Sequence, residues 1–350
     1  MYFQNELYVN DIQNISKLSL PWEKLHNTSV LITGATGMIG TFLVDVLMER
    51  NLKNGDGIRI YALGRSEERA KQRFGEYFDR DNFHFISCDI NKGYPTGIHF
   101  DYLFHCASNT HPNAYVTDPV GTILTNVIGT KNVLDLAVES HARRVMFLST
   151  VEVYGENKGT VERFRESDFG YIDCNTLRAG YSEGKRTGEA LCQAYRKQYG
   201  LDVVIPRICR VYGPTMLASD SKALAQFIKK AVAGEDIVLK SQGTQYFSYC
   251  YVGDVVSGLL YILFYGQDGE AYNIADEKSD IHLRDLAGLL AECAGKKVVF
   301  DLPDAVEAQG FSKATLALLD SSKLKSLGWT AEAGIREQAE KTVKILKEGR

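Results

Sequence analysis

Three glycines, Gly34, Gly37 and Gly40, follow a short apolar run and precede a stretch of helical periodicity. This spacing constrains the fold because the glycines permit a tight turn, close approach of the backbone to a ligand, and close packing of a helix on a strand. A helix N-terminus placed this way favours anions. The loop therefore predicts a dinucleotide site. Its expected contacts are Gly34, Thr36, Gly37, Met38, Ile39 and Gly40.

The first half of the 350-residue chain alternates short apolar runs with longer segments of helical periodicity. Near-continuous apolar strands separated by helices are typical of a parallel sheet covered on both faces, the doubly wound, Rossmann-type α/β fold. Strands are expected at 30–33, 58–63, 83–88, 102–106, 145–149 and 203–208. Helices are expected at 41–50, 67–78, 119–140 and 181–199.

After about Pro214 the alternation loosens, which predicts a smaller α/β lobe over the carboxyl edge of the sheet, where ligands bind. Helices are expected there at 223–233, 255–264, 283–294 and 335–346, and strands at 236–239 and 271–274. The expected division is an N-terminal extension at 1–28, a mainly dinucleotide-binding domain at 29–213 and a mainly substrate-binding lobe at 214–350.

Composition and charge exclude several classes of function. A net charge of -4 gives no basic footprint for nucleic acid, and no apolar run has the length of a membrane span. The first residues show neither the basic segment nor the apolar core of a signal peptide. The seven cysteines are widely spaced, and the seven histidines show no metal-ligand pattern. We expect a cytoplasmic protein with a small-molecule substrate and no metal, nucleic-acid or membrane partner.

The end of the second expected strand bears on the choice of dinucleotide. An acid there would hold the ribose of NAD, whereas an arginine accommodates the extra phosphate of NADP. This chain has Gly64, Arg65 and Ser66 instead of an acid. Arg65 and Ser66 could bind the phosphate, or Arg65 could stack on adenine or cap the next helix. Asp89 and Ile90, after the third strand, are expected to border the adenine.

Tyr181 and Lys185 lie four residues apart, one turn along the same helix face. A neighbouring ammonium favours the phenolate and lowers the pKa of a tyrosine, which could then take a proton from a sugar or alcohol hydroxyl as hydride leaves. The same spacing also occurs on solvated helix faces. Its place after the glycine loop and after Leu148-Ser149-Thr150 favours a catalytic site.

Further segments give the chain a resemblance, over about 29–329, to extended short-chain dehydrogenase/reductases of the NAD-dependent epimerase/dehydratase family. They are the segments at 125–130, 149–155, 211–214 and 320–329. Within the family, the segment from Arg178 to Arg186 resembles the catalytic helix of UDP-glucuronate decarboxylases, and Thr150-Val151-Glu152 resembles their Thr-Ser-Glu at two of three places.

The resemblance implies roles for these residues. Thr150 would hydrogen-bond the 4-hydroxyl of a sugar, Glu152 would line the sugar pocket, Tyr181 would take the 4-hydroxyl proton, and Lys185 would hold the nicotinamide ribose. Dehydratases of the family carry an acid where this chain has Val151, so 4,6-dehydration is not expected. Further implied cofactor contacts are Cys106, Ala107, Ser108, Asn126, Tyr181 and Lys185. A homodimer through the helices at 119–140 and 181–199 is also implied.

Two departures concern the substrate. Relatives have an arginine for the substrate diphosphate where this chain has Phe247, and an asparagine where it has Arg210. Arg210 could bind the diphosphate instead, since a guanidinium forks onto phosphate. Alternatively, the pocket binds something other than a standard uridine-diphosphate sugar, or Arg210 forms a structural salt bridge.

Three functions remain open at this stage. The favoured one is redox-neutral decarboxylation or epimerisation of a nucleotide sugar through a 4-keto intermediate, with NAD as the cofactor and NADP as the alternative. The second is an NADPH-dependent keto-sugar reductase, which Arg65 favours. The third is a non-catalytic dinucleotide sensor or scaffold, which the retained Tyr181 and Lys185 disfavour.

Overall fold

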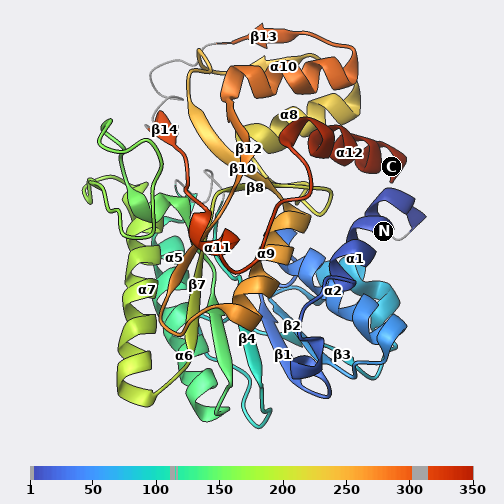
Figure 1. The fold of residues 1–350 in the computed structure, drawn as a ribbon, viewed down its shortest axis with the longest axis vertical. Coiled ribbons are helices and arrows are strands. Elements are labelled where there is room, and N and C mark those ends of the chain that lie inside the picture. The colour runs from blue at the N-terminus through green and yellow to red at the C-terminus, as the bar shows by residue number, and fades with distance from the viewer. Residues whose placement is uncertain (1–3, 111–114, 116, 302–313, 350) are drawn as a thin grey trace.

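The computed structural model describes residues 4–110, 115, 117–301 and 314–349. Its largest sheet runs through the lower half of Figure 1, with strands in the order β11-β7-β5-β4-β1-β2-β3 and β6 beside β7, all paired in parallel. The strands are β1 Ser29–Thr33, β2 Arg59–Gly64, β3 Phe83–Ser87, β4 Tyr102–His105, β5 Arg144–Phe147, β6 Ser149–Thr150, β7 Val203–Ile208 and β11 Ala271–Ile274. The predicted Rossmann-type parallel sheet is confirmed.

Helices cover both faces of this sheet because successive side chains of a strand point to opposite sides. Leu31 of β1 packs in the core that includes Val133 and Cys192, whereas Val30 joins the core that includes Phe42. The helices are α1 Glu6–Ser16, α2 Met38–Asn54, α3 Glu67–Phe74, α5 Pro119–Leu124, α6 Thr130–Glu139, α7 Ala179–Tyr199 and α9 Val252–Tyr265.

Two expected helices are interrupted. The helix predicted at 119–140 is α5, a π-helical turn at Thr125–Gly129 and α6, and the one predicted at 67–78 ends at Phe74 before a 3₁₀ turn at Gly75–Tyr77. Within the π-helical turn, the Asn126 amide donates to the carbonyl of Thr122. Side-chain bonds of this kind inside a helix compete with its regular ladder, and sequence periodicity does not register them.

A second, smaller lobe lies above the sheet in Figure 1 and has its own four-stranded sheet, in which β10 lies between β12 and β14, with β8 also paired to β10. Its strands are β8 Arg210–Tyr212, β10 Tyr246–Tyr251, β12 Asp276–His282 and β14 Leu316–Ala317, with a separate pair β9 Ile237–Leu239 and β13 Val298–Phe300. Its helices are α8 Ala223–Ala233, α10 Leu283–Ala294, α11 Ser322–Lys325 and α12 Ile335–Glu348. Between these elements, β11 returns to the large sheet, where it pairs with β7.

Candidate active site

The glycine loop lies where the strand order of the sheet reverses, between the carboxyl ends of β1 and β4. Open parallel sheets bind ligands at such a switch point. A Cβ on Gly34, whose φ is 63°, would lie 2.8 Å from Cα of Ala107, in the loop after β4. A Cβ on Gly40 would lie 2.7 Å from the carbonyl oxygen of Gly34. The glycines therefore let the backbone turn tightly into α2, whose N-terminus fits a dinucleotide phosphate.

From this loop a cavity of about 1170 Å³ extends to the N-terminal end of α7. The predicted site residues that line it are Gly34, Thr36, Gly37, Met38, Ile39, Gly40, Gly64, Arg65, Ser66, Asp89, Ile90, Cys106, Ala107, Ser108, Thr150, Glu152, Tyr181, Lys185, Arg210 and Phe247. Asn126 does not line it. This residue is buried behind the wall, where its Oδ1 accepts a hydrogen bond of 2.8 Å from Ser108 Oγ. Asn126 is therefore connected to the cavity through Ser108, which lines it.

At the β2 end of the cavity, the hydroxyl of Ser66 caps α3 by accepting a hydrogen bond from the backbone N–H of Arg69 at 3.2 Å. The helix-capping role considered for Arg65 thus belongs to Ser66. Arg65 is exposed, and among the described residues neither it nor Arg69 forms an ion pair. Both arginines line the cavity, and Arg69 is not among the residues predicted for it.

Tyr181 and Lys185 meet Thr150 at the other end of the cavity. Tyr181 is hydrogen-bonded to Thr150, which follows β5 in the short strand β6. Lys185 Nζ donates to the carbonyl oxygen of Leu148 at 2.7 Å and lies 4.8 Å from the ring centroid of Phe147. The helix α7 and the ends of β5 and β6 therefore bring together the three residues that the sequence separates.

The protonation of these groups differs from the sequence-based expectation. Burial, followed by the charge of Glu152, raises the pKa of Tyr181, while Thr150 and Arg178 oppose the rise. The expected lowering by Lys185 is wrong for this arrangement, because the Lys185 ammonium is directed at the Leu148 carbonyl. Burial lowers the pKa of Lys185 itself to about 8. Thr150 and Arg178 are thus the groups that favour the phenolate.

Arg178 is a site residue that the sequence analysis quoted only as part of a motif. Its Nη2 donates to Glu152 Oε1 at 2.7 Å, and Ser182 Oγ donates to Glu152 Oε2 at 3.3 Å. Tyr115, which the analysis missed, stacks on Tyr181 with ring centroids 5.2 Å apart. Arg178 precedes Tyr181 by three residues, so helical spacing could have placed it on the catalytic face. No comparable local signal marks Tyr115.

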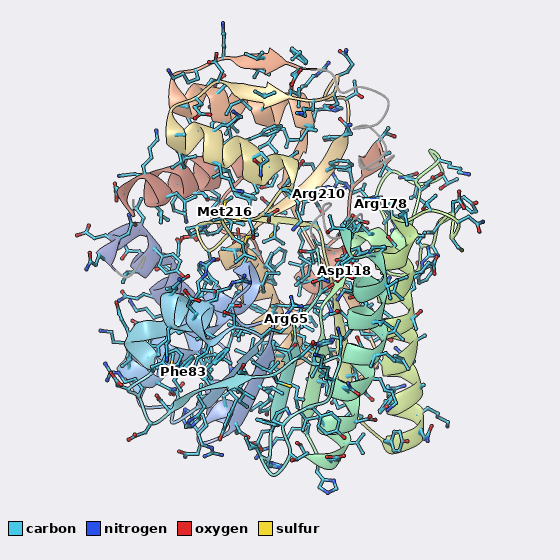
Figure 2. All side chains as sticks on the ribbon, turned by 180° about the vertical axis from the view of Figure 1, so that it is seen from behind. Arg65, Phe83, Asp118, Arg178, Arg210 and Met216 are labelled. Atoms are coloured by element: carbon cyan, nitrogen blue, oxygen red, sulfur yellow. The ribbon has the colours of Figure 1, made fainter. Side chains whose placement is uncertain are left out.

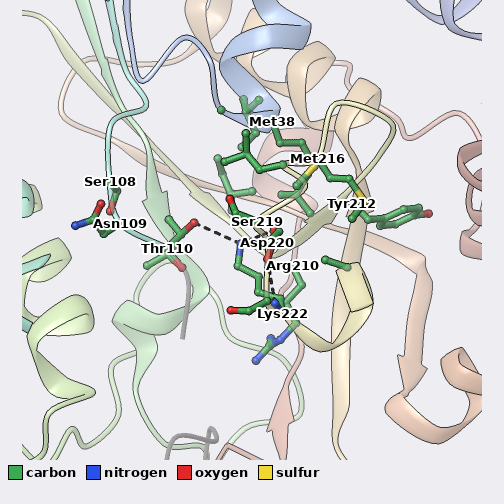
Figure 3. Close-up of a pocket in the computed structure, with 18 of the residues that line it drawn as sticks. Met38, Ser108, Asn109, Thr110, Arg210, Tyr212, Met216, Ser219, Asp220 and Lys222 are labelled. Atoms are coloured by element: carbon green, nitrogen blue, oxygen red, sulfur yellow. Dashed lines mark hydrogen bonds and ion pairs between the residues drawn. The ribbon is translucent and has the colours of Figure 1, made fainter. Parts of the chain in front are cut away.

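The two lobes also meet directly at the cavity. Figure 3 shows Lys222 between Asp220 and Thr110: its Nζ lies 3.6 Å from an Asp220 carboxylate oxygen and donates to Thr110 Oγ1 at 3.4 Å. Thr110 follows β4, and Lys222 precedes α8. This contact therefore connects the loop of the large sheet to the upper lobe.

A protein-family comparison decides the assignment. The model of the NAD dependent epimerase/dehydratase family matches residues 30–275. The chain belongs to this family. It is accordingly an enzyme of an NAD-dependent family, as predicted. UDP-glucuronic acid decarboxylase 3 of Arabidopsis thaliana is 35% identical over 316 residues, covering 89% of this chain and 86% of the relative. UDP-glucuronic acid decarboxylase 1 of Xenopus tropicalis is 35% identical over 67% of this chain and 53% of the relative.

Solved structures share the fold of this family member. The dTDP-glucose 4,6-dehydratase DesIV of Streptomyces venezuelae, with NAD and TYD bound, gives a TM-score of 0.78 at 24% identity, covering 92% of this chain and 98% of that one. The UDP-glucuronic acid 4-epimerase of Bacillus cereus, in complex with UDP-glucuronic acid and NAD, gives a TM-score of 0.76 at 21% identity, covering 92% of this chain and 100% of the epimerase chain.

Arg210 and Phe247, where this epimerase/dehydratase family member departs from the expected pattern, contact each other. The guanidinium carbon of Arg210 lies 3.4 Å from the centroid of the Phe247 ring. Figure 2 labels Arg210 with Arg178 and Arg65, and all three line the cavity. Among the described residues no carboxylate forms an ion pair with Arg210, so the structural salt bridge considered above is absent from this part of the chain.

Two other kinds of site were sought in the described part of the chain. There, no group of histidine, cysteine, aspartate or glutamate residues is arranged to hold a metal ion. No helix among those residues is both long enough and apolar enough to cross a membrane.

Proposed function

We propose that the chain converts a nucleotide sugar through a 4-keto intermediate, in a redox-neutral decarboxylation or epimerisation. The observation that carries this proposal is the convergence of Tyr181, Thr150 and Lys185 in the cavity that begins at the glycine loop. NAD would supply the hydride acceptor and, later in the cycle, the hydride donor. The glycine loop and the start of α2 would hold its diphosphate, and Lys185 its nicotinamide ribose.

Within this proposal each side chain has a separate task. Tyr181 takes the proton from the sugar 4-hydroxyl, and Thr150 hydrogen-bonds the same hydroxyl. Arg178 neutralises Glu152, whose charge otherwise opposes the phenolate. Val151 lines the cavity and has no exchangeable proton, so the site offers no acid for dehydration there. We infer that residues 29–213 mainly bind the dinucleotide and residues 214–350 mainly the substrate.

The nearest test is conversion of UDP-glucuronate. Relatives named UDP-glucuronic acid decarboxylases 3 and 5 are 35% and 33% identical over 89% of this chain, which makes that sugar the first to try. With NAD present, decarboxylation should give a UDP-pentose that mass spectrometry detects, and epimerisation should give an epimer that chromatography separates. Neither reaction should form NADH in net amount. A mass spectrum of small molecules carried through purification would name the dinucleotide independently. Binding of dinucleotide without conversion of any nucleotide sugar in a panel would contradict the proposal.

The matched variant is Tyr181→Phe. It removes one hydroxyl and should lower kcat by about 10²- to 10⁴-fold, the usual contribution of a positioned acid–base group. Dinucleotide binding by the variant should match that of the wild type, which controls for folding. Wild-type turnover in this variant would remove Tyr181 from the mechanism.

A second function, an NADPH-dependent keto-sugar reductase, is favoured by one observation. Arg65 and Arg69 line the cavity at the end of β2 without an ion pair among the described residues, and the residue directly after that strand is Arg65 and not an acid. In that reaction Tyr181 would donate the proton instead of accepting it. Net consumption of NADPH with a keto-sugar would identify the reductase, whereas the redox-neutral enzyme consumes none.

A further inference from the structure

Arg210 lines the cavity and forms no ion pair with any residue that the structure describes. The Nη1 atom of Arg210 is buried and makes no hydrogen bond. Three carboxylates among the described residues line the cavity: Asp89, Glu152 and Asp220. None of them forms an ion pair with Arg210; Glu152 pairs with Arg178, and Asp220 with Lys222. Burial lowers the pKa of Arg210, and the charge of Glu152 opposes this shift only in part, although a guanidinium keeps its charge in proteins.

The backbone and a ring fix the position of this guanidinium. Arg210 of β8 lies opposite Tyr249 of β10 in a parallel pair, and Phe247 precedes Tyr249 by two residues, across an irregularity in the pairing of β10 with β12. The Arg210 side chain crosses diagonally to lie 3.4 Å over the Phe247 ring. An aromatic ring stabilises a guanidinium that lies on the face of the ring and restricts the motion of that guanidinium. The N–H groups at the edge of the guanidinium plane stay free to donate hydrogen bonds.

Arg210 as a whole is half-buried, but its Nη1 atom is buried, and a charged group with a buried polar atom that makes no hydrogen bond is costly. The charges nearest Arg210 include Glu152 and Arg178, which already pair with each other, so the described residues supply no spare anion at this point. The ring holds the guanidinium in place without neutralising it. This arrangement suits a group that receives its counter-ion from a ligand.

We propose that Arg210, positioned by Phe247, is the residue by which this enzyme recognises an anionic group of its substrate. The inference rests on the proposed function, because it takes the cavity to be the nucleotide-sugar site. Two groups have the required chemistry: the diphosphate, and the carboxylate of a sugar acid. A guanidinium binds either one through two parallel N–H bonds. Arg210 is then a specificity residue, and Phe247 is a positioning residue that acts through it.

The test measures binding by calorimetry to the NAD-loaded protein, with UDP, UDP-glucose, UDP-glucuronate and inorganic pyrophosphate as probes. Arg210→Gln should weaken UDP and both UDP-sugars about ten- to hundred-fold if the diphosphate is the partner, the range expected of a charge-assisted bond. If the partner is the carboxylate, only UDP-glucuronate should weaken by that factor. Either outcome supports the proposal, and the pattern identifies the anion.

Three variants separate recognition from structure. Phe247→Leu should weaken the same probe less than Arg210→Gln does, because the charge remains but its platform is lost. The double variant Arg210→Asn with Phe247→Arg attaches a guanidinium to the backbone at position 247, close to where the Arg210 guanidinium now lies. It should recover part of the lost affinity. Arg336→Gln removes an equal charge from α12, where Arg336 pairs with Glu292 outside the cavity lining, and should change nothing.

The failing outcomes are distinct. Probe binding that is equal in the wild type and in Arg210→Gln would overturn the inference, as would a wild type that binds none of the four probes. Failure of the proposed function would show differently, as nucleotide-sugar binding that depends on Arg210 without any conversion of the sugar. Retained NAD binding in every variant verifies that the fold is intact.

Discussion

At the residue scale, the chemistry of Tyr181 depends on a balance between two neighbours of opposite charge. Glu152 raises the pKa of the phenol, and Arg178, paired to Glu152 at 2.7 Å, lowers it. Burial is the larger effect and acts in the same direction as Glu152. A base must lose its proton before it acts, so activity should rise with pH as Tyr181 ionises.

This balance predicts opposite shifts in two variants. Glu152→Gln removes a charge that raises the pKa of Tyr181, so the rising limb of kcat/KM against pH should move to lower pH. Arg178→Gln removes a charge that lowers it and unpairs Glu152, so the limb should move to higher pH. Arg178→Lys keeps the charge and should restore most of the profile. Shifts in the same direction, or an unmoved limb in both variants, would show that these charges do not act on the base.

Arg65 gives a separate prediction at this scale. If its guanidinium binds the 2′-phosphate of NADP, the contact is charge-assisted and contributes about 1.5–3 kcal/mol. Arg65→Ala should then weaken NADP roughly ten- to hundred-fold and leave NAD almost unchanged, as measured by fluorescence titration. Arg69→Ala, on the first turn of α3, tests whether the two arginines share the phosphate. Equal affinities for both dinucleotides before and after Arg65→Ala would remove the main support for the reductase.

At the element scale, α7 depends on glycines that face its neighbours. Gly184 and Gly188 are one turn apart. A Cβ on Gly184 would lie 2.9 Å from Cβ of Asn126, and a Cβ on Gly188 would lie 2.3 Å from the Phe147 ring. The helix therefore packs closely against the π-helical turn and the end of β5. This close packing brings Tyr181 and Lys185 to the end of the sheet beside Thr150.

The glycines of α7 predict a contrast with a glycine elsewhere. Gly188→Ala must displace the buried Phe147 ring and should destabilise the fold by about 1–3 kcal/mol, the usual cost of overpacking. Gly288, inside α10, has no atom within 4 Å of an added Cβ. Gly288→Ala should therefore stabilise by about 0.4–1 kcal/mol, because alanine restricts the unfolded chain. Urea unfolding of both variants checks the signs, and a neutral Gly188→Ala would show that α7 moves freely.

The elements differ in how far sequence could predict them. The strand at 203–208 and the helices at 223–233 and 283–294 appear with the expected bounds. The strand begins after Asp202, and the helices end before Gly234 and Gly295, so a change of residue type marks these bounds in the sequence. The lobe strands β8, β10 and β12 were not anticipated, since their pairing joins residues far apart in sequence. The contact between Arg210 and Phe247 could not be predicted for the same reason, although both residues had been identified as departures.

At the scale of the whole molecule, the N-terminal residues connect the two lobes. Tyr8 of α1 donates to Asp45 of α2, while Asp11 accepts from Tyr251 of β10 and from Lys341 of α12. The N- and C-terminal helices consequently lie side by side in Figure 1. A local sequence pattern does not predict contacts between residues this far apart in the chain, so residues 1–28 were predicted only as an extension.

Resemblance to the family predicts a homodimer through the helices at 119–140 and 181–199. Apolar residues in the first of these ranges, including Val133 and Leu136, are buried in the chain's own core and are not free to contact a partner. A different apolar group remains exposed on α5 and the π-helical turn. Its members are Val120 65%, Ile123 42%, Leu124 44% and Ile128 38% exposed.

Such an exposed apolar face on neighbouring turns indicates an interaction surface. In a dimer with a two-fold axis, the same face of both subunits would be buried. Light scattering at micromolar concentration should therefore give the mass of a dimer, and Leu124→Asp, which places a charge in the interface, should give a monomer. Phe300→Asp is the matched control, because Phe300 is equally apolar and 56% exposed but lies on β13 in the other lobe. A monomeric wild type, or a Leu124→Asp variant that stays dimeric, would contradict the assignment of this face.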